Sequence, residues 1–165
     1  MLIIYVVTNN QMKKAEREGV ECGMPLQDLM ENTGRACFDK INEITGNFAG
    51  KSFIILCGKG NNGGGGVVLA HHLNRVGAQV ICVFVNGLPA SECAKESYRR
   101  YGNQLTSVLY NQNEDNLQKL LACCDVIVDC VFGTGFHGVL EPKPLFNFIN
   151  NKAIRILIVA RNLYF

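Results

Sequence analysis

Residues 52–66, SFIILCGKGNNGGGG, join a short apolar run to a glycine-rich segment and decide the fold class. The run at 52–57 carries no charge, as expected for a strand that is buried on both faces of a parallel sheet. We expect residues 58–66 to form a loop in which glycine permits positive φ angles and the close approach of a ligand; a merely flexible turn is the alternative. A helix is predicted over 66–76, ended by Gly77, and its N-terminus would offer N–H groups to an anion such as phosphate.

The same alternation continues along the chain. Apolar runs that predict strands alternate with segments that predict helices, which is typical of a parallel sheet with helices on both faces. The predicted fold class is therefore α/β: a three-layer α/β/α sandwich with a mainly parallel, Rossmann-like sheet. The predicted strands cover residues 52–57, 79–85, 105–110, 125–131 and 154–160, and the predicted helices cover residues 66–76, 91–101 and 114–123.

The first fifty residues predict two helices rather than a separate domain. Thr8 and Gln11 fit a capping box for the first helix. Pro25 begins the second helix, in which apolar residues recur with a period of 3.6 as far as Gly46. A chain of this length is expected to form one domain, made of a helical preface and an α/β core at residues 1–50 and 51–165.

Composition and charge exclude several classes of protein. Sixteen Lys and Arg against fourteen Asp and Glu give a formal net charge of +2 without a block of like charges, so nothing indicates nucleic-acid binding. The apolar start MLIIYVV is too short to span a membrane and lacks the basic flank of a signal peptide. The eight cysteines lie mostly in apolar runs and form no CxxC motif. This pattern indicates reduced thiols and a cytoplasmic protein.

Neither standard phosphate-binding motif fits the first glycine-rich segment. No Gly-Lys-Ser/Thr closes it, so it is not a P-loop. Gly58, Gly60 and Gly63 satisfy GxGxxG, but no carboxylate follows the second predicted strand, at Val85-Asn86, to hold a ribose hydroxyl. The sequence therefore disfavours an ordinary nicotinamide-dependent dehydrogenase.

A second glycine-containing segment, DCVFGTGFHG, runs from Asp129 to Gly138. Asp129 lies near the end of an otherwise apolar strand, where an unpaired carboxylate is costly to bury. Together with the amide oxygen of Asn62 it could help to form an all-oxygen site for a hard cation. The alternative is that Asp129 caps a nearby backbone turn. Lys59 could meet a phosphate, and an exposed loop lysine is an equally good interpretation.

Three stretches of the chain together resemble the YjeF N-terminal family, the NAD(P)H-hydrate epimerases. They lie at residues 7–36, 57–73 and 125–138. The resemblance implies an α/β/α fold, usually dimeric, that interconverts the R and S forms of hydrated NADH and NADPH (NADHX and NADPHX). A partner dehydratase, which accepts only the S form, can then restore the cofactor. The resemblance also implies a potassium ion beside the substrate.

Carried over position by position, the resemblance implies the site residues. Asn62 and Asp129 would be ligands of the potassium ion. Two segments would bind the substrate: Asn61, Asn62, Gly63, Gly64 and Gly65 in the first, and Gly133, Thr134, Gly135, Phe136, His137, Gly138 and Val139 in the second.

Two departures from the family pattern bear on catalysis. The family loop reads GNNGGDG, and Gly65 stands here in place of its aspartate. The family's last strand continues into a VDIPSG-like segment with the catalytic aspartate and a further ion ligand, whereas this chain reads IVARNLYF at 158–165. Arg161 or Asn162 takes the place of that aspartate, so no catalytic residue is assigned. Two interpretations stay open: an epimerase, alone or as part of a bifunctional epimerase/dehydratase, and an eroded domain that binds a ligand or a protein.

Overall fold

The computed structural model describes residues 9–85, 87–110, 114–133 and 154–157. Within them, five parallel strands form one sheet in the order β3-β2-β1-β4-β5. Each strand lies inside a range predicted from the sequence, and the α/β class is confirmed. The strands are β1 (Ser52–Cys57), β2 (Gln79–Phe84), β3 (Thr106–Leu109), β4 (Val126–Cys130) and β5 (Ile154–Leu157).

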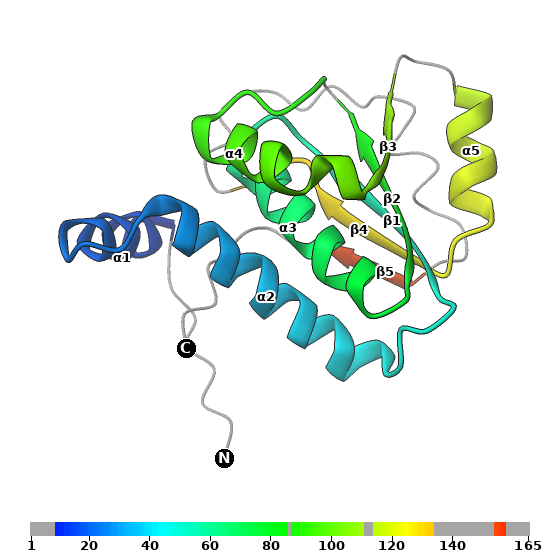
Figure 1. The fold of residues 1–165 in the computed structure, drawn as a ribbon, viewed down its shortest axis with the longest axis horizontal. Coiled ribbons are helices and arrows are strands. Elements are labelled where there is room, and N and C mark those ends of the chain that lie inside the picture. Colours follow the sequence, from blue (N-terminus) through cyan, green and yellow to red (C-terminus); the bar gives the residue numbers. More distant parts are fainter. Residues whose placement is uncertain (1–8, 86, 111–113, 134–153, 158–165) are drawn as a thin grey trace.

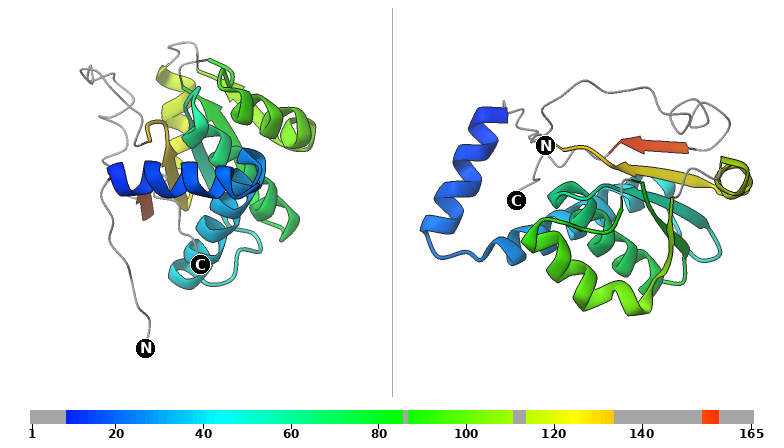
Figure 2. Two further views of the ribbon diagram at one scale, coloured as in Figure 1. Left: turned by 90° about the vertical axis from the view of Figure 1, so that its left-hand side faces the viewer. Right: turned by 90° about the horizontal axis from the view of Figure 1, so that it is seen from above.

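Helices cover the sheet on both faces. Figure 1 shows α2, α3 and α4 together on one side, and the right-hand view of Figure 2 shows that they form one layer beneath the strands. No helix among the described residues is long and apolar enough to cross a membrane. The helices are α1 (Asn9–Glu21), α2 (Leu26–Thr45), α3 (Asn61–Arg75), α4 (Glu92–Tyr101) and α5 (Glu114–Ala122), with a 3-10 turn at Gly102–Gln104.

Side chains that alternate along each strand build two separate cores. On one face, Phe53, Ile55 and Val128 pack with the apolar residues of α3. On the other face, Leu117 and Leu121 of α5 pack with neighbouring strand residues, among them Ile54, Leu56, Ile127 and Val131. Because side chains point alternately to opposite faces of a strand, this pattern fixes which face each strand residue serves.

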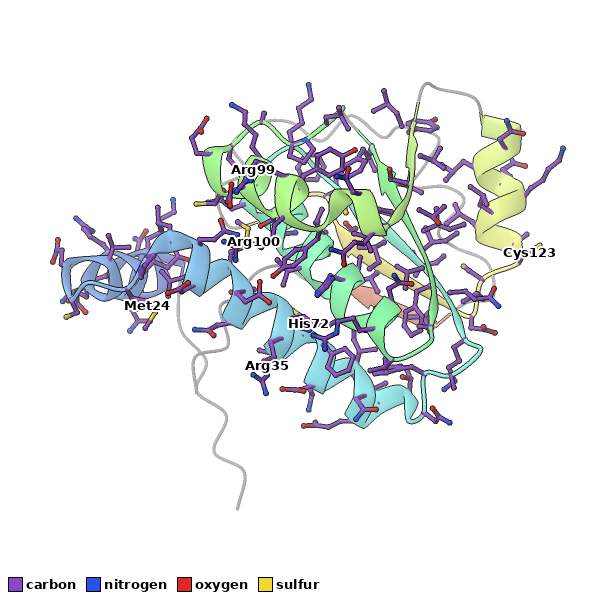
Figure 3. All side chains as sticks on the ribbon, viewed as in Figure 1. Met24, Arg35, His72, Arg99, Arg100 and Cys123 are labelled. Atoms are coloured by element: carbon purple, nitrogen blue, oxygen red, sulfur yellow. The ribbon has the colours of Figure 1, made fainter. Side chains whose placement is uncertain are left out.

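In the helical preface, α2 packs against the α/β core, whereas α1 projects away from that core (Figure 1). A β-carbon on Gly34 would lie 2.4 Å from Val68 Cγ1, so glycine allows α2 to approach α3 closely. Glu31 of α2 accepts hydrogen bonds from the phenol of Tyr101 (2.8 Å) and pairs with the imidazole of His72 (3.0 Å; Figure 3). As predicted, α2 follows Pro25 and ends at Gly46, whose φ is +69°. The predicted capping residue Thr8 lies outside the described residues.

The start of α3 is the main correction to the predicted elements. The helix begins at Asn61 rather than at residue 66, so the expected nine-residue loop contracts to residues 58–60. None of the glycines from Gly58 to Gly66 has a positive φ angle. Both the expectation of repeated positive φ and the alternative of a flexible turn are therefore wrong. A connection of this length is usual between a strand and the helix that follows it.

A carboxylate ties β1 to β4 at the amino end of the sheet. Asp125 Oδ2 accepts hydrogen bonds from the backbone N–H and the hydroxyl of Ser52, both at 2.8 Å. These bonds from Ser52 hold the pKa of Asp125 below its usual value. A lowered folded-state pKa means that the bonds stabilise the fold above the unfolded-state pKa, near pH 4, and lose this effect as the pH falls further.

Asp125→Ala is therefore expected to lower Tm at pH 7, with a gap from the wild type that narrows toward pH 3. Thermal unfolding of the wild type and of Asp125→Ala at pH 7 and pH 3, followed by circular dichroism, measures this difference in Tm. A gap that stays constant between the two pH values would show that the charge of Asp125 does not matter to the fold.

Candidate active site

The order of the strands creates a topological switch point between β1 and β4, and we call the region outside the carboxyl ends of these two strands the crevice. From β1 the chain moves to β2 and β3 on one side, and then returns to β4 on the other side of β1. In open α/β sheets, ligands bind at such a switch point, outside the carboxyl ends of the strands. Gly58 follows β1 at this edge, and its N–H donates to the carbonyl of Cys130 at the end of β4 (3.2 Å). The first glycine-rich segment thus starts at the switch point.

Glycine at positions 58 and 63 allows backbone to touch backbone at this edge. A β-carbon on Gly58 would lie 2.0 Å from the carbonyl oxygen of Val131, and one on Gly63 would lie 1.9 Å from the carbonyl oxygen of Gly58. Neither distance is possible for a real side chain, and the contacting atoms belong to the backbone. These glycines therefore set the first turn of α3 directly against the ends of β1 and β4.

The next three glycines differ in what surrounds them. A β-carbon on Gly64 would lie 2.9 Å from the Cα atom of Ala94 in α4, and one on Gly66 would lie 3.1 Å from the sulfur atoms of Cys57 and Cys130. At Gly65 the only neighbour within reach among the described residues is a methyl group of Thr33, at an ordinary contact distance of 3.9 Å. Packing therefore requires glycine at 64, favours it at 66 and leaves room for a side chain at 65.

Asn62 connects the two glycine-containing segments of the sequence. It lies in the first turn of α3, the residue as a whole is only 6% exposed, and its Nδ2 donates to the carbonyl of Phe132 (3.0 Å). A β-carbon on Gly133 would lie 3.1 Å from Asn62 Cβ, so the backbone after β4 passes close to this side chain. The structure thus brings together Asn62 and Gly133, which the sequence placed in one site.

A third segment, between β2 and α4, completes the described part of the crevice. The hydroxyl of Ser91 donates to Asn61 Oδ1 (2.6 Å), and the N–H groups of Ala90 and Ser91 donate to the carbonyl of Lys59 (2.8 and 3.3 Å). Ser91 directly precedes α4, but its hydroxyl binds Asn61 instead of capping the helix. Sequence reasoning missed this contact, since nothing in the local pattern relates residues that lie thirty positions apart.

Asp129 caps the backbone at the end of its own strand. Its Oδ1 accepts a hydrogen bond from the N–H of Val131 (2.9 Å), which is the turn-capping alternative named above. Burial raises the pKa of the Asp129 carboxyl, and the bond from Val131 opposes that shift. The alternation along β4 places Asp129 with Ile127 and Val131 on the face that α5 covers. Since Asn62 lies in the first turn of a helix on the other face, a cation shared by the two would have to lie beyond the end of β4.

The remaining predicted residues lie outside the described part of the chain. They are the substrate-binding candidates Thr134, Gly135, Phe136, His137, Gly138 and Val139, together with Arg161 and Asn162 at the position of the family's catalytic aspartate. Among the described residues, no three His, Cys, Asp or Glu side chains are grouped so that they could hold a metal ion.

The described crevice suits a polar, anionic ligand. The first N–H groups of a helix lack partners within that helix, and here they open onto the switch point because α3 begins at Asn61. Two thiols, those of Cys57 and Cys130, lie close by. A hydrogen bond with Cys82, together with burial, raises the pKa of the Cys57 thiol well above its usual value, and burial does the same for Cys130. Because the thiolate is the reactive form, these cysteines act as packing groups rather than nucleophiles.

Fold and site define a Rossmann-like α/β domain with a glycine-lined crevice at the switch point. Residues 26–162 match the family model described as "YjeF-related protein N-terminus", and the chain belongs to this family. A relative from Moorella thermoacetica, named bifunctional NAD(P)H-hydrate repair enzyme Nnr, is 35% identical over 89% of this chain and 29% of its own length. The NAD(P)H-hydrate epimerase of Nitrosopumilus maritimus is 35% identical over 87% of this chain and 67% of its own length.

A solved structure shows the same fold. The crystal structure of the yeast protein ynu0 superposes with a TM-score of 0.72 and 24% identity, covering 88% of this chain and 63% of the yeast chain. The chain thus spans less than a third of the bifunctional relative and about two thirds of the epimerase.

Proposed function

We propose that this chain is an NAD(P)H-hydrate epimerase that interconverts the R and S forms of NADHX and NADPHX. The hydrogen bond from Asn62 to the carbonyl of Phe132 carries the proposal, because it joins two of the three segments by which the chain resembles the family. A relative named NAD(P)H-hydrate epimerase, 35% identical over most of the chain, supports the same activity.

The chemistry of the crevice matches this substrate. A hydrated nicotinamide dinucleotide carries a pyrophosphate, which suits the N–H groups at the start of α3. The carbon to be inverted bears both a hydroxyl group and the ring nitrogen, so a proton donor and a proton acceptor must lie near it. Among the described residues, Asn62 and Asp129 are polar side chains that contact the backbone just after β4 and can position the substrate or an ion. The reacting ring would lie toward that strand end.

A potassium ion is part of the proposal, with Asn62 and Asp129 as ligands. Their donor set fits such an ion, because hard cations prefer carboxylate and amide oxygens, and Asp129 and Asn62 supply one of each. Asp129 is a partly buried carboxylate whose raised pKa reflects lost hydration. A bound potassium ion would supply positive charge beside the substrate.

Asp129→Asn is expected to raise Tm in potassium-free buffer and to abolish the gain in Tm that potassium gives the wild type. The raised pKa of Asp129 means that keeping it charged above its folded-state pKa costs stability, a cost that disappears as the pH falls. The amide keeps an oxygen for the Val131 N–H but removes the charge. Thermal melts with potassium or tetramethylammonium chloride test this.

Asp39→Asn, on α2, is the matched control and should respond to potassium as the wild type does. An equal potassium effect in wild type and Asp129→Asn would refute the ion assignment.

The activity itself is tested with purified R-NADHX. An added S-specific dehydratase should consume all of the R form at a rate proportional to the amount of this chain. Without the chain, only slow spontaneous epimerisation should limit the reaction. A folded chain that leaves the rate unchanged would favour the eroded binding domain.

Three further features accompany the proposal. The bifunctional relatives support coupling of this reaction to an NAD(P)HX dehydratase. A homodimer is proposed from the family resemblance, and exposed Val20, Met24 and Leu26 near the junction of α1 and α2 could take part in it. We also propose a cytoplasmic location, where thiols stay reduced, because all eight cysteines are free in the structure. Size-exclusion chromatography with light scattering measures the oligomeric state.

A further inference from the structure

Lys59 lies in the three-residue connection between β1 and α3, at the edge of the crevice. Its backbone is fixed, because its carbonyl accepts hydrogen bonds from the N–H groups of both Ala90 and Ser91. These bonds attach Lys59 to the segment that follows β2. The lysine therefore belongs structurally to two segments of the crevice, although the sequence places it in only one.

The side chain of Lys59 extends over Gly87, just after β2. A β-carbon on Gly87 would lie 2.9 Å from Lys59 Cε and 3.4 Å from Nζ, so the lysine occupies the space that a side chain at position 87 would need. Gly87 has a φ of +107°, a conformation that also favours glycine. Both features leave the ammonium group beside Gly87, three residues beyond the end of β2. Within the described residues it forms no ion pair with an acidic side chain.

The end of the second strand is where Rossmann-like sites distinguish the two nicotinamide cofactors. A carboxylate at this place binds the free 2′-hydroxyl of an NAD-type ribose, whereas a cation accommodates the 2′-phosphate of an NADP-type ribose. No acidic residue follows β2 here in Val85-Asn86-Gly87-Leu88. The nearest acidic residue along the chain, Glu92, is exposed and paired with Lys95 (2.8 Å). The ammonium group of Lys59 lies beside this segment instead of a carboxylate.

We infer that Lys59 recognises the 2′-phosphate of NADPHX and makes this chain prefer NADPHX to NADHX. The inference rests on the proposed function, which it refines by naming the preferred substrate. The charge-assisted contact of Lys59 with the 2′-phosphate has no counterpart in NADHX, because NADHX lacks that group. A lysine that served the pyrophosphate instead would help both substrates equally, since both contain that group.

The experiment compares wild type, Lys59→Met and Lys59→Arg with both substrates in the dehydratase-coupled assay. The ratio of kcat/KM for NADPHX to kcat/KM for NADHX is expected to fall about fivefold in Lys59→Met, as for loss of one partly exposed charge contact. Lys59→Arg should retain the wild-type ratio. Lys40→Met is the control, because Lys40 is exposed on α2 and paired with Glu43; it removes one positive charge elsewhere and should leave the ratio unchanged.

A binding measurement separates this inference from the proposed function. Calorimetry with adenosine 2′,5′-bisphosphate and with adenosine 5′-monophosphate should show tighter binding of the bisphosphate by the wild type and loss of that preference in Lys59→Met. Equal losses for both nucleotides, or no loss, would overturn the inference. Failure of the wild type to epimerise either substrate would reject the proposed function, and the two nucleotide affinities would still decide the role of Lys59.

Discussion

Gly63→Ala is expected to destabilise the protein by about 3 kcal/mol or to prevent folding, as severe overpacking does. A methyl group at this position would lie 1.9 Å from the carbonyl oxygen of Gly58, and neither group can move without shifting α3 away from the sheet. Gly65→Ala is expected to do the opposite. Its methyl group meets only Thr33 at 3.9 Å, and alanine is intrinsically better than glycine inside a helix by about 1 kcal/mol.

The two variants control for each other, because they make the same substitution two positions apart in one helix. Urea unfolding followed by circular dichroism measures both free energies of unfolding. If Gly63→Ala proved as stable as the wild type, α3 would not be packed against the end of β1 as the structure has it. If Gly65→Ala were as damaging as Gly63→Ala, the room beside position 65 would not exist.

Asn62→Ala is expected to lower epimerase activity about 100-fold, the scale on which a displacement of about 1 Å acts in an active site. The substitution removes the bond that holds the segment after β4 against α3. Loss of this part-buried hydrogen bond should also cost about 1 kcal/mol of stability. Coupled assays and urea unfolding measure the two effects.

Asn74→Ala is the matched control for this substitution. Asn74 lies at the other end of α3, and its Nδ2 also donates to a backbone carbonyl, that of Gln104 (3.2 Å), but the bond is exposed. Loss of that bond should change stability by less than about 0.5 kcal/mol and leave activity unchanged. Similar activity losses in both variants would indicate that Asn62 acts only through the stability of α3.

The strands could be predicted from sequence because each is a short, mostly apolar run with clear boundaries. The start of α3 could not, since glycine is among the weakest helix formers and four glycines stand in the first turns. What makes these turns helical is tertiary contact: Gly64 packs against Ala94, and Gly66 packs against Cys130. Neither partner is near in the sequence, so local propensity gave the wrong boundary.

Residues of the candidate site could be predicted where they belong to a sequence motif. Contacts that depend only on tertiary packing could not be predicted. Asn62 and Gly133 were placed in one site, and the structure brings them together. The hydrogen bond of Asp129 to Val131 was foreseen only as an alternative. The hydrogen bond of Ser91 to Asn61 and the contact of Lys59 with Gly87 both depend on how α4 packs against α3. No local sequence pattern reveals that packing.

Gly65 also bears on the family's missing aspartate. Among glycines 63–66, it is the one at which a β-carbon would meet only an ordinary contact among the described residues. The β-carbon of an aspartate there would fit among the described residues, and its charge would be favourable near a helix N-terminus. Packing of the described residues thus does not require glycine at this position.

The most direct measurement is a titration of the 15N-labelled protein with NADPHX, followed through its backbone amide resonances. The largest shifts are predicted at Gly58–Asn62 and Val131–Gly133, on the two sides of the crevice between β1 and β4. Asn62→Ala should weaken the titration, and Asn74→Ala should not. Shifts confined to α1, α2 or α5, or none at saturating NADPHX, would contradict the placement of the substrate at this switch point.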